Sequence, residues 1–239
     1  MVRRVFSPSL VAIYSVVLCM LVILALTGSR VVTVIAENTP LERSNRFIID
    51  AGHGGVDGGA TSCSGVLESA INLQIALRLD DLMHLVGLDT VMIRKTDISV
   101  YTYGETIAQK KMSDLQQRVK VVNDTKDALL ISIHQNYFSD GRYSGAQVFY
   151  AATEGSRDLA SLIQSQFVSS LNPGSKRLAK KASGIYLMDH IERTGVLIEC
   201  GFLSNPEEEA KLRDGSYQKK ICCIICSVCS KFSNNCSMT

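Results

Sequence analysis

Four side chains in this sequence could together bind a metal ion and move a proton: His53, Glu68, His134 and Glu199. Two imidazoles and one carboxylate, taken from distant points of a chain, form a ligand set of catalytic zinc, which leaves a fourth coordination position open for water. The second carboxylate would then be free to act as a base. Because a lone histidine is more often a surface or core residue than a ligand, the prediction depends on the surroundings of each residue.

The surroundings of these residues favour a buried site. His53 stands among glycines and His134 ends a continuous apolar run, and neither context is typical of a surface histidine. Glu199 directly follows three apolar residues, so its carboxylate needs a partner; a capping or salt-bridging role is the alternative. His84, within a helical pattern, and His190, in a polar loop, are interpreted as bystanders.

Apolar periodicity predicts strands that alternate with helices in a single domain. Strands are expected at 46–50, 88–93, 128–133, 146–150 and 195–198, and helices at 68–86, 113–123 with Ser113 as the cap, 156–171, from Pro206, and 217–228. Such alternation gives an α/β fold, a mixed and mostly parallel sheet with helices on both faces. Ligands bind at the carboxyl ends of the strands of such sheets. His53, His134 and Glu199 would meet at this edge, with Glu68 in or near the first turn of a helix.

An uncharged apolar run of 17 residues, Leu10 to Leu26, follows an arginine pair near the N-terminus. It is long enough for a thin bilayer, and the positive-inside rule places the following residues outside the cytoplasm. A cleaved signal peptide ending at Val34-Ile35-Ala36 is the alternative, and both hypotheses export residues 37–239. The predicted organisation is a cytoplasmic N-terminus at 1–9, one N-terminal transmembrane helix as a signal anchor at 10–27, a linker at 28–45, a catalytic domain at 46–232 and a tail at 233–239.

The charge balance excludes one class of partner. Three of the 25 basic residues precede Glu37, so the remainder of the chain carries 22 basic and 23 acidic residues. A nucleic-acid-binding protein would be expected to carry a basic excess. We therefore predict no nucleic-acid partner.

The eight cysteines would normally indicate a disulfide framework in an exported protein, but their placement argues otherwise. Five of them crowd the C-terminus, and Cys223, Cys226 and Cys229 have a spacing similar to that of iron–sulfur ligands. The apolar stripe at 221, 224, 225 and 228 favours a core helix instead, in which cysteine packs as a small hydrophobe. Cys200 follows Glu199 on a strand, so it should point away from the site.

Three segments carry a family resemblance. They are Asp50 to Ala60 (DAGHGGVDGGA), Ser132 to Asn136 (SIHQN) and Leu197 to Asn205 (LIECGFLSN). The first resembles the opening signature of the zinc-dependent N-acetylmuramoyl-L-alanine amidases of the Amidase_3 family, the second resembles a ligand segment of that family, and the third its catalytic segment. Glu68 falls where the second metal ligand of the family lies. The resemblance covers residues 46 to about 220.

The resemblance implies that His53, Glu68 and His134 bind one Zn²⁺ ion and that Glu199 is the general base. It implies hydrolysis of the amide bond between the N-acetylmuramoyl lactyl group and L-alanine in bacterial peptidoglycan. Within the family the chain is most similar to amidases of spore-forming bacteria that help to form muramic-δ-lactam in the spore cortex. With the anchor at 10–27, we expect a single-pass protein of the cell membrane, with its catalytic domain outside the cytoplasm or in the space between the spore membranes.

Three partners are expected: peptidoglycan as substrate, the membrane through the anchor, and an accessory protein that orders the zinc site. The accessory protein is a hypothesis, because three ligands in glycine-rich surroundings would hold zinc weakly. Asp50, Arg94 and Asn136 could support the ligands or only the fold. Two other functions stay open, a peptidoglycan-binding pseudoenzyme and a different zinc peptidase that acts within the stem peptide. The presence of all four site residues argues against the pseudoenzyme.

The chain departs from the family pattern at three places. Ala51 replaces the proline that usually precedes the Gly-His pair, which could loosen the turn. Ser69 stands where lysine is common, and the family expects an alanine-rich helix where this chain has its cysteine-rich segment. None of the three changes removes a predicted ligand.

Overall fold

The computed structural model describes residues 17–18 and 45–236, with side chains through Ser233. The chain divides into two units, Met1–Glu42 and Arg43–Thr239, and the sheet and its helices belong to the second. The predicted N-terminus, nearly all of the anchor and nearly all of the linker lie outside the described residues. No helix in the described part of the chain combines the length and the apolar character needed to cross a membrane.

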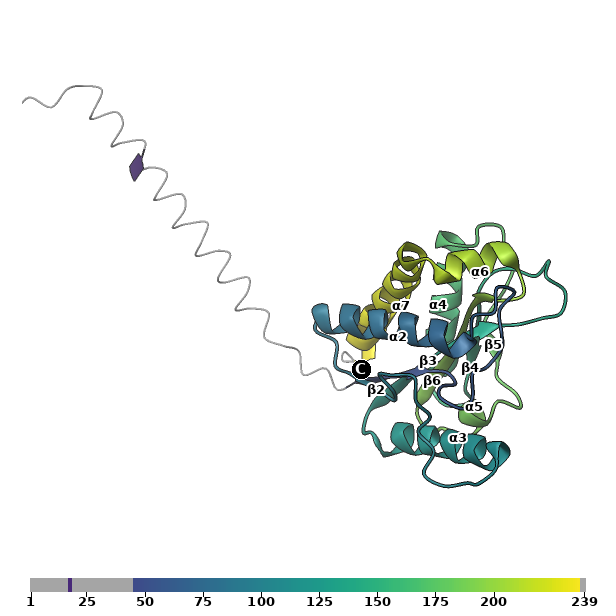
Figure 1. The fold of residues 1–239 in the computed structure, drawn as a ribbon. Coiled ribbons are helices and arrows are strands. Elements are labelled where there is room, and N and C mark those ends of the chain that lie inside the picture. Colours follow the sequence, from purple (N-terminus) through teal and green to yellow (C-terminus); the bar gives the residue numbers. More distant parts are fainter. Residues whose placement is uncertain (1–16, 19–44, 237–239) are drawn as a thin grey trace, which may run out of the picture. The chain divides into compact units, whose positions relative to one another are not determined.

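A six-stranded sheet forms the centre of the second unit (Figure 1). Its order is β2-β1-β3-β6-β4-β5, and all neighbours pair in parallel except β4 and β6, which are antiparallel. The strands are β1 (Arg46–Ala51), β2 (Thr90–Met92), β3 (Ala128–Asn136), β4 (Gln147–Tyr150), β5 (Lys180–Lys181) and β6 (Thr194–Phe202). The predicted mixed, mostly parallel sheet is confirmed.

Helices cover both faces of the sheet, as predicted (Figure 1). Four of them, α2, α4, α6 and α7, lie on one face, and α3 and α5 lie on the other. Their bounds are α2 (Glu68–Leu85), α3 (Ile107–Asp124), α4 (Ser156–Ser170), α5 (Tyr186–His190), α6 (Pro206–Arg213) and α7 (Gly215–Cys236). The short elements β5 and α5 were not predicted, because neither is long enough to show a period.

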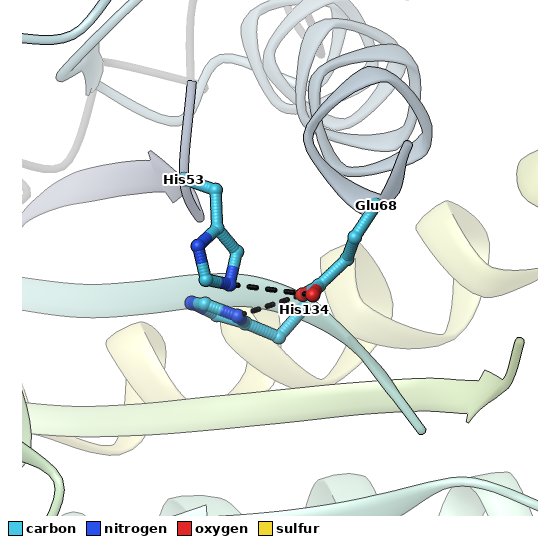
Figure 2. A group of neighbouring side chains, drawn as sticks. All are labelled: His53, Glu68 and His134. Carbon is cyan, nitrogen blue, oxygen red and sulfur yellow. Dashed lines mark hydrogen bonds and ion pairs between the residues drawn. The ribbon is translucent and has the colours of Figure 1, made fainter. Parts of the chain in front are cut away.

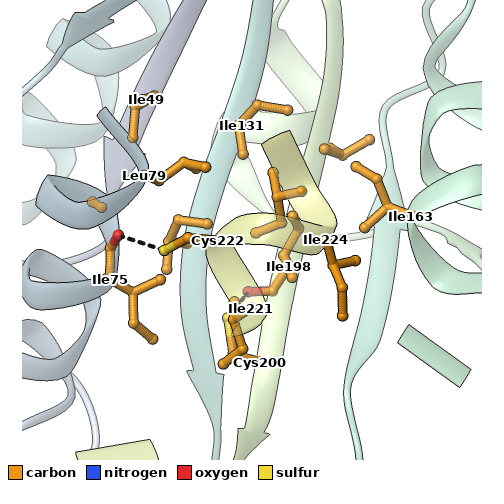
Figure 3. Packing of buried hydrophobic residues seen from close by; sticks show 14 of the residues in the cluster. Ile49, Ile75, Leu79, Ile131, Ile163, Ile198, Cys200, Ile221, Cys222 and Ile224 are labelled. Atoms are coloured by element: carbon orange, nitrogen blue, oxygen red, sulfur yellow. Dashed lines mark hydrogen bonds between the residues drawn. The ribbon is translucent and has the colours of Figure 1, made fainter. Parts of the chain in front are cut away.

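The alternation of side chains along the strands separates two buried clusters. Ile131 and Ile133 of β3 point to the α2 and α7 face, whereas Leu130 points to the α3 and α5 face. In the larger cluster, Ile131 packs with Ile75 of α2 and Ile221 of α7 (Figure 3). Burying one such side chain contributes roughly 1.5–3 kcal/mol. Because this cluster contains more buried residues than the other, it provides most of the apolar stabilisation of the domain.

The cysteine-rich segment forms the core helix that its apolar stripe predicts. In α7, Ile221 and Cys229 are fully buried, and Cys222 donates a hydrogen bond from its thiol to the carbonyl of Ile75, 3.5 Å away (Figure 3). Burial raises the pKa of the Cys222 thiol to about 12, so the group stays protonated. Cys200 faces the same cluster, which confirms that it points away from the site.

Several boundaries differ from the prediction. Strand β3 ends at Asn136 instead of residue 133, α7 spans Gly215–Cys236 instead of 217–228, and α3 and β6 also differ. Helix α3 begins at Ile107, where Thr106 accepts a hydrogen bond from the Gln109 amide in a capping box. Ser113 is therefore no cap; it lies inside the helix, and its hydroxyl accepts hydrogen bonds from the amides of Thr102 and Tyr103 at 3.0 and 3.2 Å. Strand β6 continues to Phe202, four residues beyond the predicted end, because it stays paired with β3 through a bulge.

Candidate active site

The structure brings His53, Glu68 and His134 together at the carboxyl edge of the sheet (Figure 2). One ligand atom from each residue lies within 4.8 Å of the other two, and no other such group of histidine, cysteine, aspartate and glutamate occurs among the residues that the structure describes. Glu68 reaches both rings, with 3.3 Å from Oε2 to His53 Nε2 and 3.0 Å from Oε1 to His134 Nδ1. Both predicted bystanders, His84 and His190, lie outside this group.

The turn after β1 positions His53. Its backbone has a φ of 59°, in the left-handed region that few residues other than glycine adopt, so the surrounding structure must hold it there. Asp57 Oδ2 lies 2.8 Å from His53 Nδ1, and Lys111 Nζ lies 3.1 Å from the same carboxylate oxygen. A carboxylate at Nδ1 fixes the ring orientation and leaves Nε2 free to act as a ligand. Burial alone lowers the pKa of His53, but Asp57 and Glu68 together raise that pKa to about 9.

Glu68 is the first residue of α2 and is only 4% exposed. Its oxygens accept hydrogen bonds from the amides of Gln135 and Ala60 at 3.1 and 3.0 Å, and from the Asn72 side chain at 3.2 Å. Burial raises the pKa of Glu68, but the two histidines outweigh that effect and hold the pKa far below its ordinary value. The helix N-terminus also favours a negative charge at this position. Glu68 therefore remains an ionised carboxylate, the form that a metal requires.

Two glycines leave the space that these side chains occupy. A Cβ at Gly52 would lie 2.2 Å from His134 Nε2, and a Cβ at Gly59 would lie 2.6 Å from Glu68 Oε2. Both distances are below any real contact, so an added side chain would displace a donor. Glycine at these positions therefore allows the His134 and Glu68 side chains to approach the backbone, in addition to forming the turn.

Glu199 lies beside the three donors, in register with His134 on the neighbouring strand. Its Oε2 atom is buried and has no hydrogen-bond partner. Burial raises the pKa of Glu199 to about 7; the nearby Glu68 carboxylate also raises that pKa, while His134 and His53 lower it. A buried carboxyl group with a pKa near neutrality can take up and release a proton at physiological pH.

Two buried arginines bind the backbone of the turn that carries His53. Buried Arg118 of α3 pairs with Asp50 and donates to the carbonyls of Ala51 and His53 at 2.9 and 2.8 Å. Arg94 donates to the carbonyl of Ala51 at 2.8 Å and to three other carbonyls, those of Gly52, Ser69 and Thr96. These contacts give Asp50 and Arg94 a structural role, and they fix Ala51 without the proline that is usual there.

Sequence reasoning missed the partners of His53. Asp57 follows His53 by four residues in the same glycine-rich turn, and this spacing was a usable signal. Lys111 and Arg118 gave no comparable signal, because they lie on α3, far along the chain. Asn136, named as a possible support, is paired with Phe202 at the end of β3.

A cavity of about 240 Å³ lies next to the two histidines, on the face that carries α3 and α5. Its walls include Lys111 and Leu115 of α3, and Ile185 and Tyr186 at the start of α5. The cavity is therefore apolar on two sides and carries a cation near Asp57. A substrate group could enter it next to the donor atoms.

The donor set fits a divalent cation such as zinc, because two imidazole nitrogens and one carboxylate can close around one point. The second carboxylate, Glu199, has a buried oxygen without a hydrogen-bond partner. The fold and the site together define a class of protein, an α/β domain that can hold a divalent metal ion beside an acid–base group.

The chain belongs to the N-acetylmuramoyl-L-alanine amidase family, Amidase_3, whose model matches residues 47–228. It is 38% identical over 175 residues to the germination-specific N-acetylmuramoyl-L-alanine amidase of Bacillus subtilis (strain 168). The aligned region covers 72% of this chain and 73% of that relative. The family predicted from the three motifs is thus confirmed.

Solved structures agree with this assignment. The CwlD amidase from Clostridioides difficile, solved in complex with the GerS lipoprotein, superposes with a TM-score of 0.75 at 35% identity, over 78% of this chain and 97% of that one. An N-acetylmuramoyl-L-alanine amidase from Clostridium difficile 630 gives a TM-score of 0.68 at 28% identity, over 80% of this chain and 97% of that one. The predicted similarity to amidases of spore-forming bacteria is confirmed.

Proposed function

We propose that this protein is a zinc-dependent N-acetylmuramoyl-L-alanine amidase that hydrolyses the bond between the lactyl group of muramic acid and L-alanine in peptidoglycan. The observation that carries the proposal is the meeting of three donor atoms, within 4.8 Å of one another, beside the unpartnered carboxylate of Glu199. The membership of the chain in the family supports the choice of substrate.

In this proposal His53, Glu68 and His134 hold the zinc ion. Zinc supplies Lewis acidity at such a site, which makes water more acidic and stabilises the negative charge that develops on a carbonyl oxygen. Asp57 keeps the His53 ring in place, since its carboxylate lies 2.8 Å from Nδ1. Hydrogen bonds from the amides of Ala60 and Gln135 hold the Glu68 carboxylate in place.

Glu199 carries the proton. It accepts a proton from the water whose oxygen adds to the carbonyl carbon, and it returns that proton to the amide nitrogen. The carbon–nitrogen bond then breaks, so the lactyl group leaves as a carboxylic acid and L-alanine leaves with a free amino group. A pKa of about 7 suits both transfers.

The test compares the full-length protein with Glu199→Gln on purified peptidoglycan, with and without zinc after treatment with a chelator. Mass spectrometry should show peptide-free muramic acid and new L-alanine amino termini only when zinc is present. Glu199→Gln should keep its zinc and lose activity at least about 100-fold, the usual contribution of a general base. His134→Ala, by contrast, should lose the metal itself.

Each alternative gives a different result in the same experiment. A zinc peptidase that acts within the stem would shorten the peptides and leave them attached to muramic acid. A pseudoenzyme would change neither product under any metal condition. Cleavage by Glu199→Gln at the rate of the unmodified protein would show that the assigned base is wrong.

We further propose that the substrate is the peptidoglycan of the spore cortex, where the reaction would precede the formation of muramic-δ-lactam. The germination-specific name of the Bacillus subtilis relative supports this proposal. Spores of a strain without the gene should contain cortex that lacks muramic-δ-lactam. A normal lactam content in those spores would remove the cortex proposal and leave the amidase activity untouched.

The proposed location is the cell membrane, with one N-terminal anchor at 10–27 and the catalytic domain outside the cytoplasm. The apolar run after the arginine pair supports it. N-terminal sequencing of the membrane fraction should recover an uncleaved N-terminus. A mature protein that begins near residue 37 would instead support the signal-peptide hypothesis.

An accessory protein that orders the zinc site is also proposed. The support is that a relative, CwlD of Clostridioides difficile, was solved in complex with the GerS lipoprotein. Zinc affinity measured with and without a candidate lipoprotein tests the idea, and equal affinities would reject it.

A further inference from the structure

Aromatic side chains gather on the loop that follows β3. Phe138 and Tyr143 are 51% and 47% exposed, and their rings meet edge to face with centroids 5.0 Å apart. Tyr143 also stacks on Phe202, 6.1 Å away, and the guanidinium of Arg177 lies 5.3 Å from the centre of the Phe202 ring. These four residues are called the aromatic platform below.

The aromatic platform is held by contacts with its neighbours. The amide of Phe138 donates to Ser204 Oγ at 3.3 Å, and the side chain of Asn205 donates to the carbonyl of Tyr143 at 3.3 Å. Arg177 donates to the carbonyl of Ser144 at 3.0 Å. Because these bonds restrain the backbone and the rings contact one another, a ligand would bind here with a smaller loss of conformational entropy.

The aromatic platform lies at the same edge of the sheet as the candidate active site. Phe202 is the last residue of β6 and follows Glu199 by three residues, and its partner Asn136 follows His134 by two. At about 3.3 Å per residue, Phe202 stands roughly 10 Å from Glu199 along the strand. A ligand on the platform would therefore reach the active site across a distance of one or two sugar rings.

We propose that the aromatic platform is a glycan subsite that binds a sugar ring of the peptidoglycan strand next to the muramic acid whose amide is cut. This inference rests on the proposed amidase function. Exposed apolar patches of ordered side chains mark binding surfaces, and aromatic faces match the C–H faces of pyranose rings. Asp140 and Arg142, which form an exposed ion pair on the same loop, supply acceptors and donors for sugar hydroxyls.

The experiment compares two substrates that differ only in glycan length: intact peptidoglycan strands and a muramoyl-peptide with a single sugar. Phe138→Leu and Tyr143→Leu each remove an aromatic face and keep an apolar side chain. We expect the double variant to lose at least tenfold in kcat/KM on intact strands, mainly through KM. Its kcat/KM on the single-sugar substrate should stay within twofold of the unmodified protein.

Tyr103→Leu is the matched control. Tyr103 is an aromatic residue of similar exposure, 57%, but it lies against Gln116 of α3 and outside the platform. It should leave kcat/KM unchanged on both substrates. A thermal melt of every variant shows whether each one is folded, and the single variants replace the double variant if it is not.

Binding measured without catalysis separates this inference from the proposed function. Peptide-free glycan strands should bind Glu199→Gln, and the two platform substitutions should weaken that binding at least tenfold in calorimetry. Equal loss of kcat/KM on both substrates, no loss on either, or loss only of the binding of an accessory protein would each overturn the glycan subsite. If the unmodified protein binds strands through the platform but cuts neither substrate, the amidase proposal fails and the subsite stands.

Discussion

On the face of the sheet that carries α2 and α7, the large buried cluster consists of aliphatic, aromatic and sulfur-containing side chains that need only fill space. At the carboxyl edge, the buried side chains are charged, and most of them have a specific partner, as in the pair of Arg118 with Asp50. An apolar contact has no direction, so this face can accept the cysteines of α7 in place of other small residues. A buried charge loses its compensation when its partner changes, so the edge should tolerate much less.

The largest effect is expected from Arg118→Met. The change leaves the buried carboxylate of Asp50 without its cation and removes the Arg118 hydrogen bonds to the carbonyls of Ala51 and His53, of which only Ala51 keeps a second donor, Arg94. Breaking a buried ion pair from one side costs roughly 3–5 kcal/mol of unfolding free energy. Denaturant unfolding measures it, with Lys120→Met on the same helix as the control, because the pair of Lys120 with Asp124 is exposed. Equal losses from both changes would contradict the comparison.

Asp57→Asn should weaken zinc binding without unfolding the domain. The amide keeps the shape of the carboxylate but loses the charge that fixes His53 through Nδ1 and pairs with Lys111. Loss of such a supporting carboxylate lowers metal affinity about 10- to 100-fold. Competition with a zinc chelator measures the affinity, and Asp124→Asn, on the exposed surface, is the control. An unchanged zinc affinity would show that Asp57 does not position the ligand.

The unfolding free energy should fall in acid because of Asp50. Burial raises the pKa of this carboxyl, but the combined effect of Arg118, Ser132 and His134 is larger and lowers it. The net pKa is therefore below the ordinary value of 3.8. A group with a lowered folded-state pKa contributes stability that is complete above its unfolded pKa and is lost as the pH falls through the folded one. Unfolding titrations from pH 5 downward should show this slope, to which Asp50 alone adds at most about 1.4 kcal/mol per pH unit. Asp50→Asn should reduce the slope, and an unchanged slope would assign it to other groups.

The smallest effects are expected in α7. Cys222 is buried against α2 and its neighbour Cys223 is exposed, so the two form a matched pair. Cys222→Ala removes a buried sulfur and its hydrogen bond, and it should cost about 1 kcal/mol of unfolding free energy. Cys223→Ala should stay within about 0.5 kcal/mol. A larger loss at Cys223 would indicate that this cysteine has a role beyond the core helix.

Local patterns in the sequence were sufficient for the alternating strands and helices, the glycine turn around His53, and the meeting of His53, Glu68 and His134 at one edge. Apolar periodicity and glycine act within a few residues, so their consequences can be predicted from neighbouring positions. The edge at which the donors meet follows from the parallel sheet, in which the carboxyl ends of the strands lie together.

Contacts between distant parts of the chain decided the rest. Arg118 reaches Asp50 across 68 positions, Lys111 reaches Asp57 from another helix, and Ser113 binds the preceding loop where a helix cap was predicted. Strand β6 extends past Glu199 because β3 pairs with it, and β4 lies antiparallel to β6 although nothing in its own residues requires this. Pairing, burial and charge compensation depend on which segments become neighbours in space, and that choice is made by the packing of the whole domain.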